Sequence, residues 1–120
     1  MKVVVTSQGT DLASPVDPRF GRAAQFILVD SETGHHEVYA NQQALDAAQG
    51  AGIQAARVVV DLGAEAVITG NVGPKAFMAL EAGRVAVYIG ATGTVEEALG
   101  ELKQGTLRLA DGANVDGHWT

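Results

Sequence analysis

The sequence predicts a single α/β domain with a mixed sheet of five strands flanked by helices. At 120 residues, of which 47% are hydrophobic, the chain is long enough for one hydrophobic core. Short apolar runs separated by turns fill its first third, as expected for antiparallel strands. Beyond residue 50, helical spacing of apolar residues alternates with short buried runs, which is typical of α/β domains. The predicted order is β-β-β-α-β-α-β-α.

The first three strands are predicted at residues 3–6, 25–30 and 36–41. The sequence Ser-Glu-Thr-Gly at residues 31–34 forms the turn between the second strand and the third. These three strands therefore form an antiparallel meander. A long loop at residues 7–22 joins the first strand to the second.

The second half begins with a helix at residues 50–62. Ile53, Ala56 and Val60 fall on one face of this helix, and Gly63 is well placed to end it. In the chain as a whole, alanine, valine and glycine dominate and only 5% of residues are aromatic, which favours close packing of helix against sheet through small side chains.

Two further strand–helix pairs follow. Residues 65–69 and 85–89 are short buried strands, and Pro74 is a natural first residue for the helix between them, which Gly83 stops. The sequence Thr-Val-Glu-Glu at 94–97 fits a capping box, so a third helix starts near Val95 and ends before Gly105. Residues 107–109 can add a short edge strand, and residues 110–120 form a polar tail.

The predicted topology places every strand-to-helix junction at one end of the sheet. Right-handed crossovers make the later two strands parallel to the first, so their C-terminal ends meet. Ligands bind at this end of open α/β sheets. We call this end the rim; it comprises the loop at 7–22 and the glycine-rich junctions at 49–52, 70–73 and 90–94.

The rim has the composition of a site for a compact anion. Each glycine-rich junction leads into a helix, where backbone N–H groups and the helix dipole favour negative charge. Arg19 and Arg22, on a loop stiffened by two prolines, add positive charge, and Lys75 can add more. The alternative is that the glycines serve turn geometry alone and that both arginines are solvated.

Composition excludes several classes of function. With 8 Lys plus Arg against 14 Asp plus Glu, the net charge is −6, which disfavours nucleic acid and anionic lipid surfaces. The chain has no cysteine, so disulfides, thiolate catalysis and Cys-ligated metal sites are excluded. No apolar run approaches the roughly 20 residues of a membrane helix. Without a recognisable signal peptide, we expect a cytoplasmic protein.

No catalytic constellation is apparent, and we expect the protein not to be an enzyme. The sequence contains no nucleophile elbow, phosphate-binding P-loop or dinucleotide fingerprint. His35 and His36 are adjacent, so they point to opposite faces of a strand and are best interpreted as solvated turn residues. His118 and Trp119 lie in the tail, where Trp119 is expected to pack the tail down.

Four segments occur together in a familiar order: SPVDPRFGR at 14–22, GAGIQAA at 50–56, AVITGNVGPKAF at 66–77 and GRVAVY at 83–88. In these segments the chain resembles the dinitrogenase iron–molybdenum cofactor biosynthesis family, and most closely its small stand-alone, orange-protein-like members. The resemblance covers nearly the whole chain, so residues 1–120 are expected to form one domain of this kind.

The resemblance implies a ribonuclease-H-like fold and a role as a carrier in cofactor assembly. It implies non-covalent binding of an anionic metal–sulfur cluster or its precursor, of the iron–molybdenum or molybdenum–copper sulfide type, with assembly proteins as possible partners. The residues carried over by the resemblance are Arg19, Phe20, Gly21, Arg22, Gly50, Gly52, Gly70, Asn71, Gly73 and Pro74.

One departure from the family pattern concerns metal coordination. Many relatives have a histidine just before the Gly-Ala-Gly-Ile sequence, where this chain has Gln49. The resemblance therefore leaves the metal ligands unidentified. Two alternatives stay open at this point: a protein-interaction or regulatory module, and a pocket for a small phosphorylated metabolite, each using the same rim.

Overall fold

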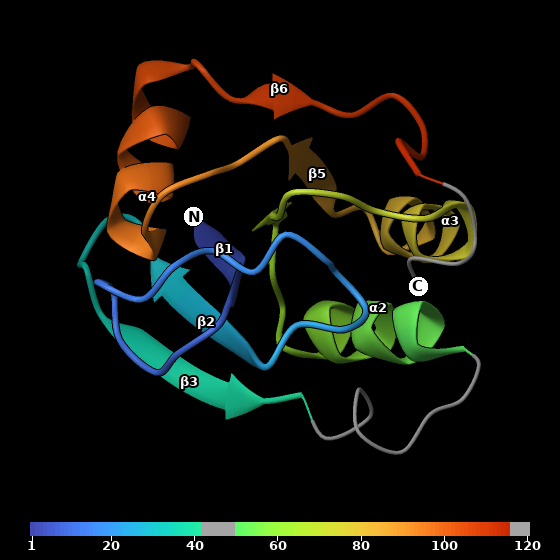
Figure 1. Cartoon of the computed structure of the whole chain (residues 1–120), viewed down its shortest axis with the longest axis horizontal. Helices are drawn as coiled ribbons and strands as arrows, with labels where there is room; N and C mark the ends of the chain where they lie inside the picture. The colour runs from blue at the N-terminus through green and yellow to red at the C-terminus, as the bar shows by residue number, and fades with distance from the viewer. Residues whose placement is uncertain (42–49, 116–120) are drawn as a thin grey trace.

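One mixed sheet of six strands, in the order β3-β2-β1-β4-β5-β6, organises the molecule (Figure 1). The structure is a computed structural model and describes residues 1–41 and 50–115. The strands are β1 Lys2–Ser7, β2 Gln25–Asp30, β3 His36–Ala40, β4 Ala66–Ile68, β5 Ala86–Ile89 and β6 Arg108–Leu109.

Strand directions agree with the topology predicted from the sequence. β2 is antiparallel to both β1 and β3, with Val4 opposite Leu28 and Ile27 opposite Val38. β4 is parallel to β1 and to β5, as right-handed crossovers require. The sheet has six strands instead of five because the anticipated edge strand does form, pairing Leu109 with Tyr88.

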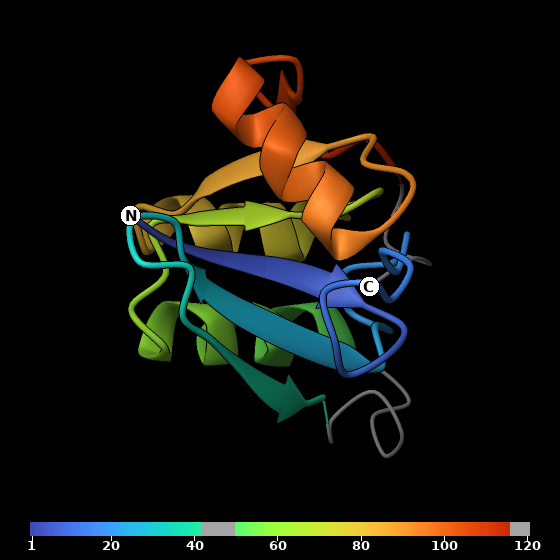
Figure 2. The same ribbon diagram turned by 90° about the vertical axis from the view of Figure 1, so that its left-hand side faces the viewer.

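Helices cover both faces of the sheet (Figure 2). α2 Ala51–Asp61 and α3 Pro74–Ala82 pack together on one face, and α4 Val95–Gln104 lies on the other. Because side chains alternate along a strand, Val4 of β1 joins the α2–α3 core, while Val3 and Val5 face α4. β1 is therefore buried from both sides, as its apolar sequence predicts.

The two cores differ in the size of their side chains. On the α2–α3 face, Phe20 and Phe26 lie with their ring centroids 6.2 Å apart, beside the small residues Ala55 and Ala56 of α2. On the α4 face, Val95 and other aliphatic residues fill the space. Phe20 comes from the loop after β1, so the larger core extends beneath that loop.

Helix termini follow the local sequence signals. α2 ends at Asp61, and Gly63 then adopts the left-handed conformation with φ 78°, which glycine tolerates best. Pro74 occupies the first turn of α3. α4 has the predicted capping box, in which the N–H of Glu97 donates to Thr94 Oγ1 at 3.1 Å and the N–H of Thr94 donates to Glu97 Oε1 at 2.9 Å.

None of the helices in residues 1–41 and 50–115 has the length and apolar character needed to cross a bilayer.

Candidate functional site

The loop between β1 and β2, residues 8–24, lies across the end of the sheet where the parallel strands finish (Figure 2). We call it the arginine loop. It first folds back along the end of β1, where the N–H of Gln8 donates to the carbonyl of Pro15 at 2.9 Å. The N–H of Asp17 then donates to the carbonyl of Thr6 at 2.8 Å. These bonds hold the first half of the loop at the rim.

The arginine loop contacts all three glycine-rich junctions. At the junction before α4, the N–H of Val16 donates to the carbonyl of Gly93 at 2.9 Å. At the junction before α3, the N–H of Asn71 donates to the carbonyl of Pro18 at 2.7 Å. At the start of α2, Gly21 lies directly against the backbone of Gly52. The rim therefore brings together four separate segments, as the topology leads one to expect.

Asp17 closes the part of the loop that carries the arginines. Its side chain is buried, and its two carboxylate oxygens accept hydrogen bonds from the N–H groups of Arg19 at 3.1 Å and Ala24 at 3.4 Å. An Asp before a proline commonly bonds the backbone two residues onward in this way. The carboxylate thus fixes both ends of the segment that contains Arg19 and Arg22.

Asn41 holds the same segment from the end of β3. Its Nδ2 donates to the carbonyls of Gly21 at 3.2 Å and Ala23 at 2.9 Å. The residue is 3% exposed, yet its Oδ1 has no hydrogen-bond partner among residues 1–41 and 50–115. A buried, unpaired acceptor is unusual, and here it lies at the edge of the candidate site.

Two of the candidate glycines, Gly21 and Gly70, are needed for packing of the loop. A Cβ on Gly21 would lie 2.9 Å from the backbone N of Gly52, and a Cβ on Gly70 would lie 2.8 Å from Pro18. Gly52 is itself buried at this contact. These glycines let the loop approach the junctions closely, which is a packing role distinct from the turn geometry that the sequence left as an alternative.

The remaining junction residues define the starts of α2 and α3. Gly50 is the N-cap of α2 with φ 77°, and Gly73 is the N-cap of α3 in an extended conformation, followed by Pro74. Neither N-cap makes a side-chain capping bond, since glycine has none to offer. The first N–H groups of both helices are therefore left for other acceptors.

The expectation that all three helices present unused N–H groups is wrong for α4. The N–H of Val95 donates to the carbonyl of Ser14 and that of Glu96 to the carbonyl of Leu12, both at 2.9 Å. The N–H of Glu97 is taken by Thr94. The arginine loop itself supplies these acceptors, so the start of α4 is saturated from within the chain.

The starts of α2 and α3 differ from that of α4. Within residues 1–41 and 50–115, no hydrogen bond is made by the N–H groups of Ala51, Gly52 and Ile53 in α2, or of Gly73, Lys75 and Ala76 at α3, although only Ile53 and Lys75 among these residues are not buried. The positive charges nearby are Arg19 and Lys75, which are exposed, and Arg22, which is half-buried. The rim thus combines backbone donors with cationic side chains.

Two candidate residues, Phe20 and Asn71, hold the arginine loop in place. Phe20 is fully buried against Phe26, so its side chain anchors the arginine loop in the core and does not reach the rim surface. Asn71 is bonded on both sides, since its Nδ2 donates to the carbonyl of Pro18 at 3.1 Å and its backbone carbonyl accepts from Phe20. Asn71 is therefore a support for the loop.

Other candidates fall outside the site or outside the described residues. Gln49, His118 and Trp119 belong to segments that the structure does not describe. His35 lies in the β2–β3 turn, at the end of β3 away from the rim, where its Nε2 is 3.6 Å from Glu37. In the described part of the chain, no three His, Asp or Glu side chains group closely enough to hold a metal ion.

Three supporting residues were not singled out by sequence reasoning: Asp17, Asn41 and Asn114. The Asp-Pro pair at Asp17 is a local turn signal that could have identified the first. Asn41 and Asn114 act over 18 and 42 residues respectively, through bonds to Ala23 and Val72. No local sequence pattern predicts contacts between residues so far apart in the chain.

Comparison with known proteins supports a single family. In sequence, the chain is 30% identical over 104 residues to an uncharacterized protein of Methanocaldococcus jannaschii, covering 80% of this chain and 87% of that protein. In structure, it is similar to the apo form of the orange protein from Desulfovibrio gigas, with a TM-score of 0.92 and 41% identity, covering 95% of this chain and 96% of the other.

A putative NifB protein from Thermotoga is also similar, with a TM-score of 0.79 and 41% identity over 90% of this chain and 91% of that one. The model of the family described as dinitrogenase iron-molybdenum cofactor matches residues 1–105, which include the whole arginine loop and all three glycine-rich junctions. The chain therefore belongs to the dinitrogenase iron-molybdenum cofactor family.

Proposed function

We propose that the rim binds an anionic metal–sulfur cluster or its precursor, of the iron–molybdenum or molybdenum–copper sulfide type, and that the protein carries it without catalysing a reaction. One observation carries this proposal. The N–H groups at the starts of α2 and α3 have no acceptor among the described residues, and they lie beside the loop that bears Arg19 and Arg22. Such an arrangement favours negative charge.

Family membership supports the choice of anion. The family description names an iron–molybdenum cofactor, and the Desulfovibrio gigas relative is described as an apo form. Sulfide clusters of this kind are compact and negatively charged, so guanidinium groups and backbone N–H donors suit them. Binding through the sulfide shell needs no cysteine, and the chain has none.

The absence of a metal-ligand group among the described side chains shapes the proposal further. Attraction through charge and N–H donors is reversible, and a carrier must both take up and release its cargo. The protein would hold the cluster by its outer sulfides. A rigid loop fixed by Asp17 and Asn41 keeps the arginines in place before the cargo arrives, which lowers the entropic cost of binding.

Titration with tetrathiomolybdate under exclusion of oxygen tests the proposal. We expect saturable binding, and we expect Arg19→Ala and Arg22→Ala each to weaken it about tenfold to 100-fold, the range for loss of a charged hydrogen bond. Arg57→Ala is the matched control, because Arg57 is exposed on α2 and its loss changes the net charge equally. Unchanged affinity in both loop variants would exclude the arginines from the site.

A parallel experiment with phosphate distinguishes binding of a metal–sulfur cluster from binding of a small phosphorylated metabolite. If phosphate raises the melting temperature and thiomolybdate does not, the rim is a site for a phosphorylated small molecule. If neither anion has an effect on the wild-type chain, the proposal fails. Metal analysis and a visible absorption spectrum of protein purified without oxygen would show directly which metal accompanies it.

A further inference from the structure

The C-terminal segment returns to the rim and occupies part of it. After β6, residues 110–115 run across the molecule toward α3 (Figure 1). The N–H of Ala110 donates to the carbonyl of Val87 at 2.8 Å, and the N–H of Asn114 donates to the carbonyl of Val72 at 3.1 Å. The segment is thus held at both ends, first on β5 and then on the junction that leads into α3.

Asn114 makes the decisive contact at that junction. Its Oδ1 accepts a hydrogen bond from the N–H of Val72 at 2.7 Å, and its Nδ2 donates to the carbonyl of Gly70 at 3.3 Å and to Asn71 Oδ1 at 3.1 Å. Val72 immediately precedes Gly73, the N-cap of α3. An oxygen from the C-terminal segment therefore already sits on an N–H group at the edge of the proposed anion site.

We propose that Asn114 is an internal competitor for the rim: an anion that binds at the start of α3 displaces the Asn114 side chain from Val72. This inference rests on the proposed function, because it assumes that the rim binds an anion. The amide oxygen occupies the position in which an anionic ligand would accept from Val72, alongside the N–H groups of Gly73, Lys75 and Ala76. Asn114 thereby lowers the affinity of the rim for its cargo.

The competition has a defined strength and direction. A protein whose binding-competent state is only partly populated has its apparent affinity reduced by that fraction, so removal of the competitor increases affinity. Asn114 is exposed, and of its three side-chain hydrogen bonds only the one from Val72 competes directly with the ligand, so the expected gain in affinity on its removal is about fivefold. Loss of a merely supporting residue would act in the opposite direction and weaken binding.

The test compares wild type, Asn114→Ala and Asn114→Asp in the full chain by titration with tetrathiomolybdate. We expect Asn114→Ala to bind about fivefold more tightly. Aspartate keeps an acceptor for Val72 and adds negative charge next to the ligand, so we expect Asn114→Asp to bind more weakly than wild type. The melting temperature of each variant serves as the check that the fold is retained.

A second measurement observes the displacement itself. In ¹⁵N-labelled wild-type protein, saturation with thiomolybdate should move the side-chain amide signals of Asn114 to the positions typical of a solvated asparagine. Affinity of Asn114→Ala equal to or below that of wild type, or Asn114 signals unmoved at saturation, would overturn the competition and leave cluster binding standing. If neither protein binds, the proposed function fails and the competition fails with it.

Discussion

The backbone of Gly21, in the arginine loop, lies so close to Gly52, in the first turn of α2, that no side chain fits between them. A Cβ placed on Gly21 would lie 2.9 Å from both the N and the Cα of Gly52. Asn41 holds the carbonyl of Gly21 from the other side. The position of Arg22, the next residue, therefore depends on a contact between two backbones.

Gly21→Ala should destabilise the protein and disturb the loop. The added methyl group would meet backbone atoms that cannot rotate away, so we expect a loss of about 1–3 kcal/mol in the free energy of unfolding. Gly100→Ala is the matched control: a Cβ there meets nothing within 4 Å, and in the middle of α4 alanine should stabilise by about 0.5–1 kcal/mol. Denaturant unfolding measures both free energies of unfolding. A change in the same direction for the two variants would contradict this account.

Asp17→Ala should loosen the arginine segment more than Asp17→Asn. The alanine variant leaves the N–H groups of Arg19 and Ala24 without their acceptors, at a cost of about 1–3 kcal/mol for loss of partners to partly buried donors. Asparagine keeps one carbonyl oxygen and should retain part of that stability. Hydrogen exchange at these two amides should accelerate strongly in Asp17→Ala; unchanged exchange there would show that Asp17 does not hold the segment.

Much of the fold follows from local sequence, and the reasons are visible in single elements. The strand at Gln25–Asp30 was predicted with its observed bounds, because an apolar run followed by a Ser-Glu-Thr-Gly turn leaves few alternatives. The capping box at Thr94 and Glu97 and the first-turn position of Pro74 were equally local signals. Parallel pairing then followed from the handedness of crossovers.

The site was less predictable, because its details depend on contacts between distant segments. The sequence marks a helix start at Val95, yet only the fold reveals that the carbonyl of Ser14 already takes its N–H. Phe20 lies between Arg19 and Arg22 in the sequence, but its side chain is buried in the core. The hydrogen bond between Val72 and Asn114 likewise joins distant segments, and no local sequence pattern predicts it.

The end of α3 stores backbone strain that can be removed. Arg84 has φ 61°, and no other non-glycine residue in the described part of the chain has a positive φ. The adjacent Gly83 has φ −84°, a conformation that any residue can adopt. Glycine is needed there for space, because an added Cβ would lie 2.5 Å from Cγ2 of Val60 in α2.

We therefore expect opposite effects from two neighbouring substitutions. Arg84→Gly should raise the free energy of unfolding by about 0.5–1 kcal/mol, since relief of left-handed strain exceeds the entropy that glycine adds to the unfolded chain. Gly83→Ala should lower it by about 1–3 kcal/mol through crowding of α2 against α3. Thermal melting that showed Arg84→Gly to be destabilising would remove strain as the explanation.

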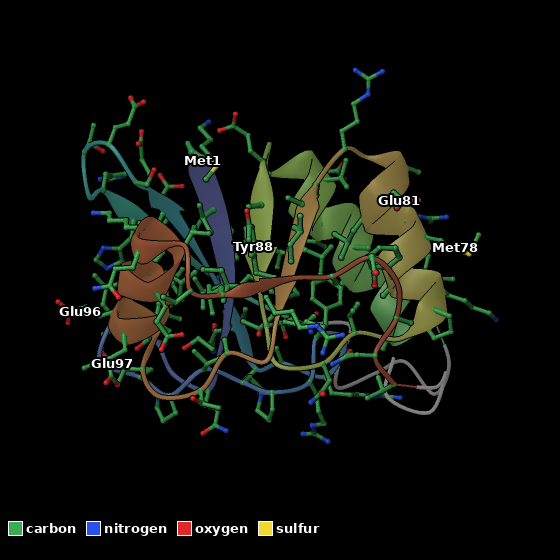
Figure 3. The ribbon with its side chains drawn as sticks, turned by 90° about the horizontal axis from the view of Figure 1, so that it is seen from above. Met1, Met78, Glu81, Tyr88, Glu96 and Glu97 are labelled. Atoms are coloured by element: carbon green, nitrogen blue, oxygen red, sulfur yellow. The ribbon has the colours of Figure 1, made fainter. Side chains whose placement is uncertain are left out.

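The loss of stability as the pH falls should depend in part on Glu97, whose carboxylate takes part in the capping box of α4. Figure 3 shows the side chains of Glu96 and Glu97 on the outer side of the start of α4, but only Glu97 accepts the N–H of Thr94. That backbone hydrogen bond, with a smaller contribution from the Thr94 side chain, holds the pKa of Glu97 below its ordinary value. The ionised carboxylate therefore stabilises the folded state above the pKa of the unfolded chain, and this contribution disappears as the pH falls through the lower, folded pKa.

Glu97→Gln should accordingly cost stability at about pH 7 and little at about pH 3, so the two unfolding curves converge on the acid side. Glu96→Gln removes the same charge from a chain of net charge −6 but breaks no capping bond. It therefore serves as the control for the stability gained when repulsion between negative charges is reduced. The measured quantity is the difference in unfolding free energy between the two variants across this range of pH. A constant difference would show that the capping bond of Glu97 does not depend on its ionisation.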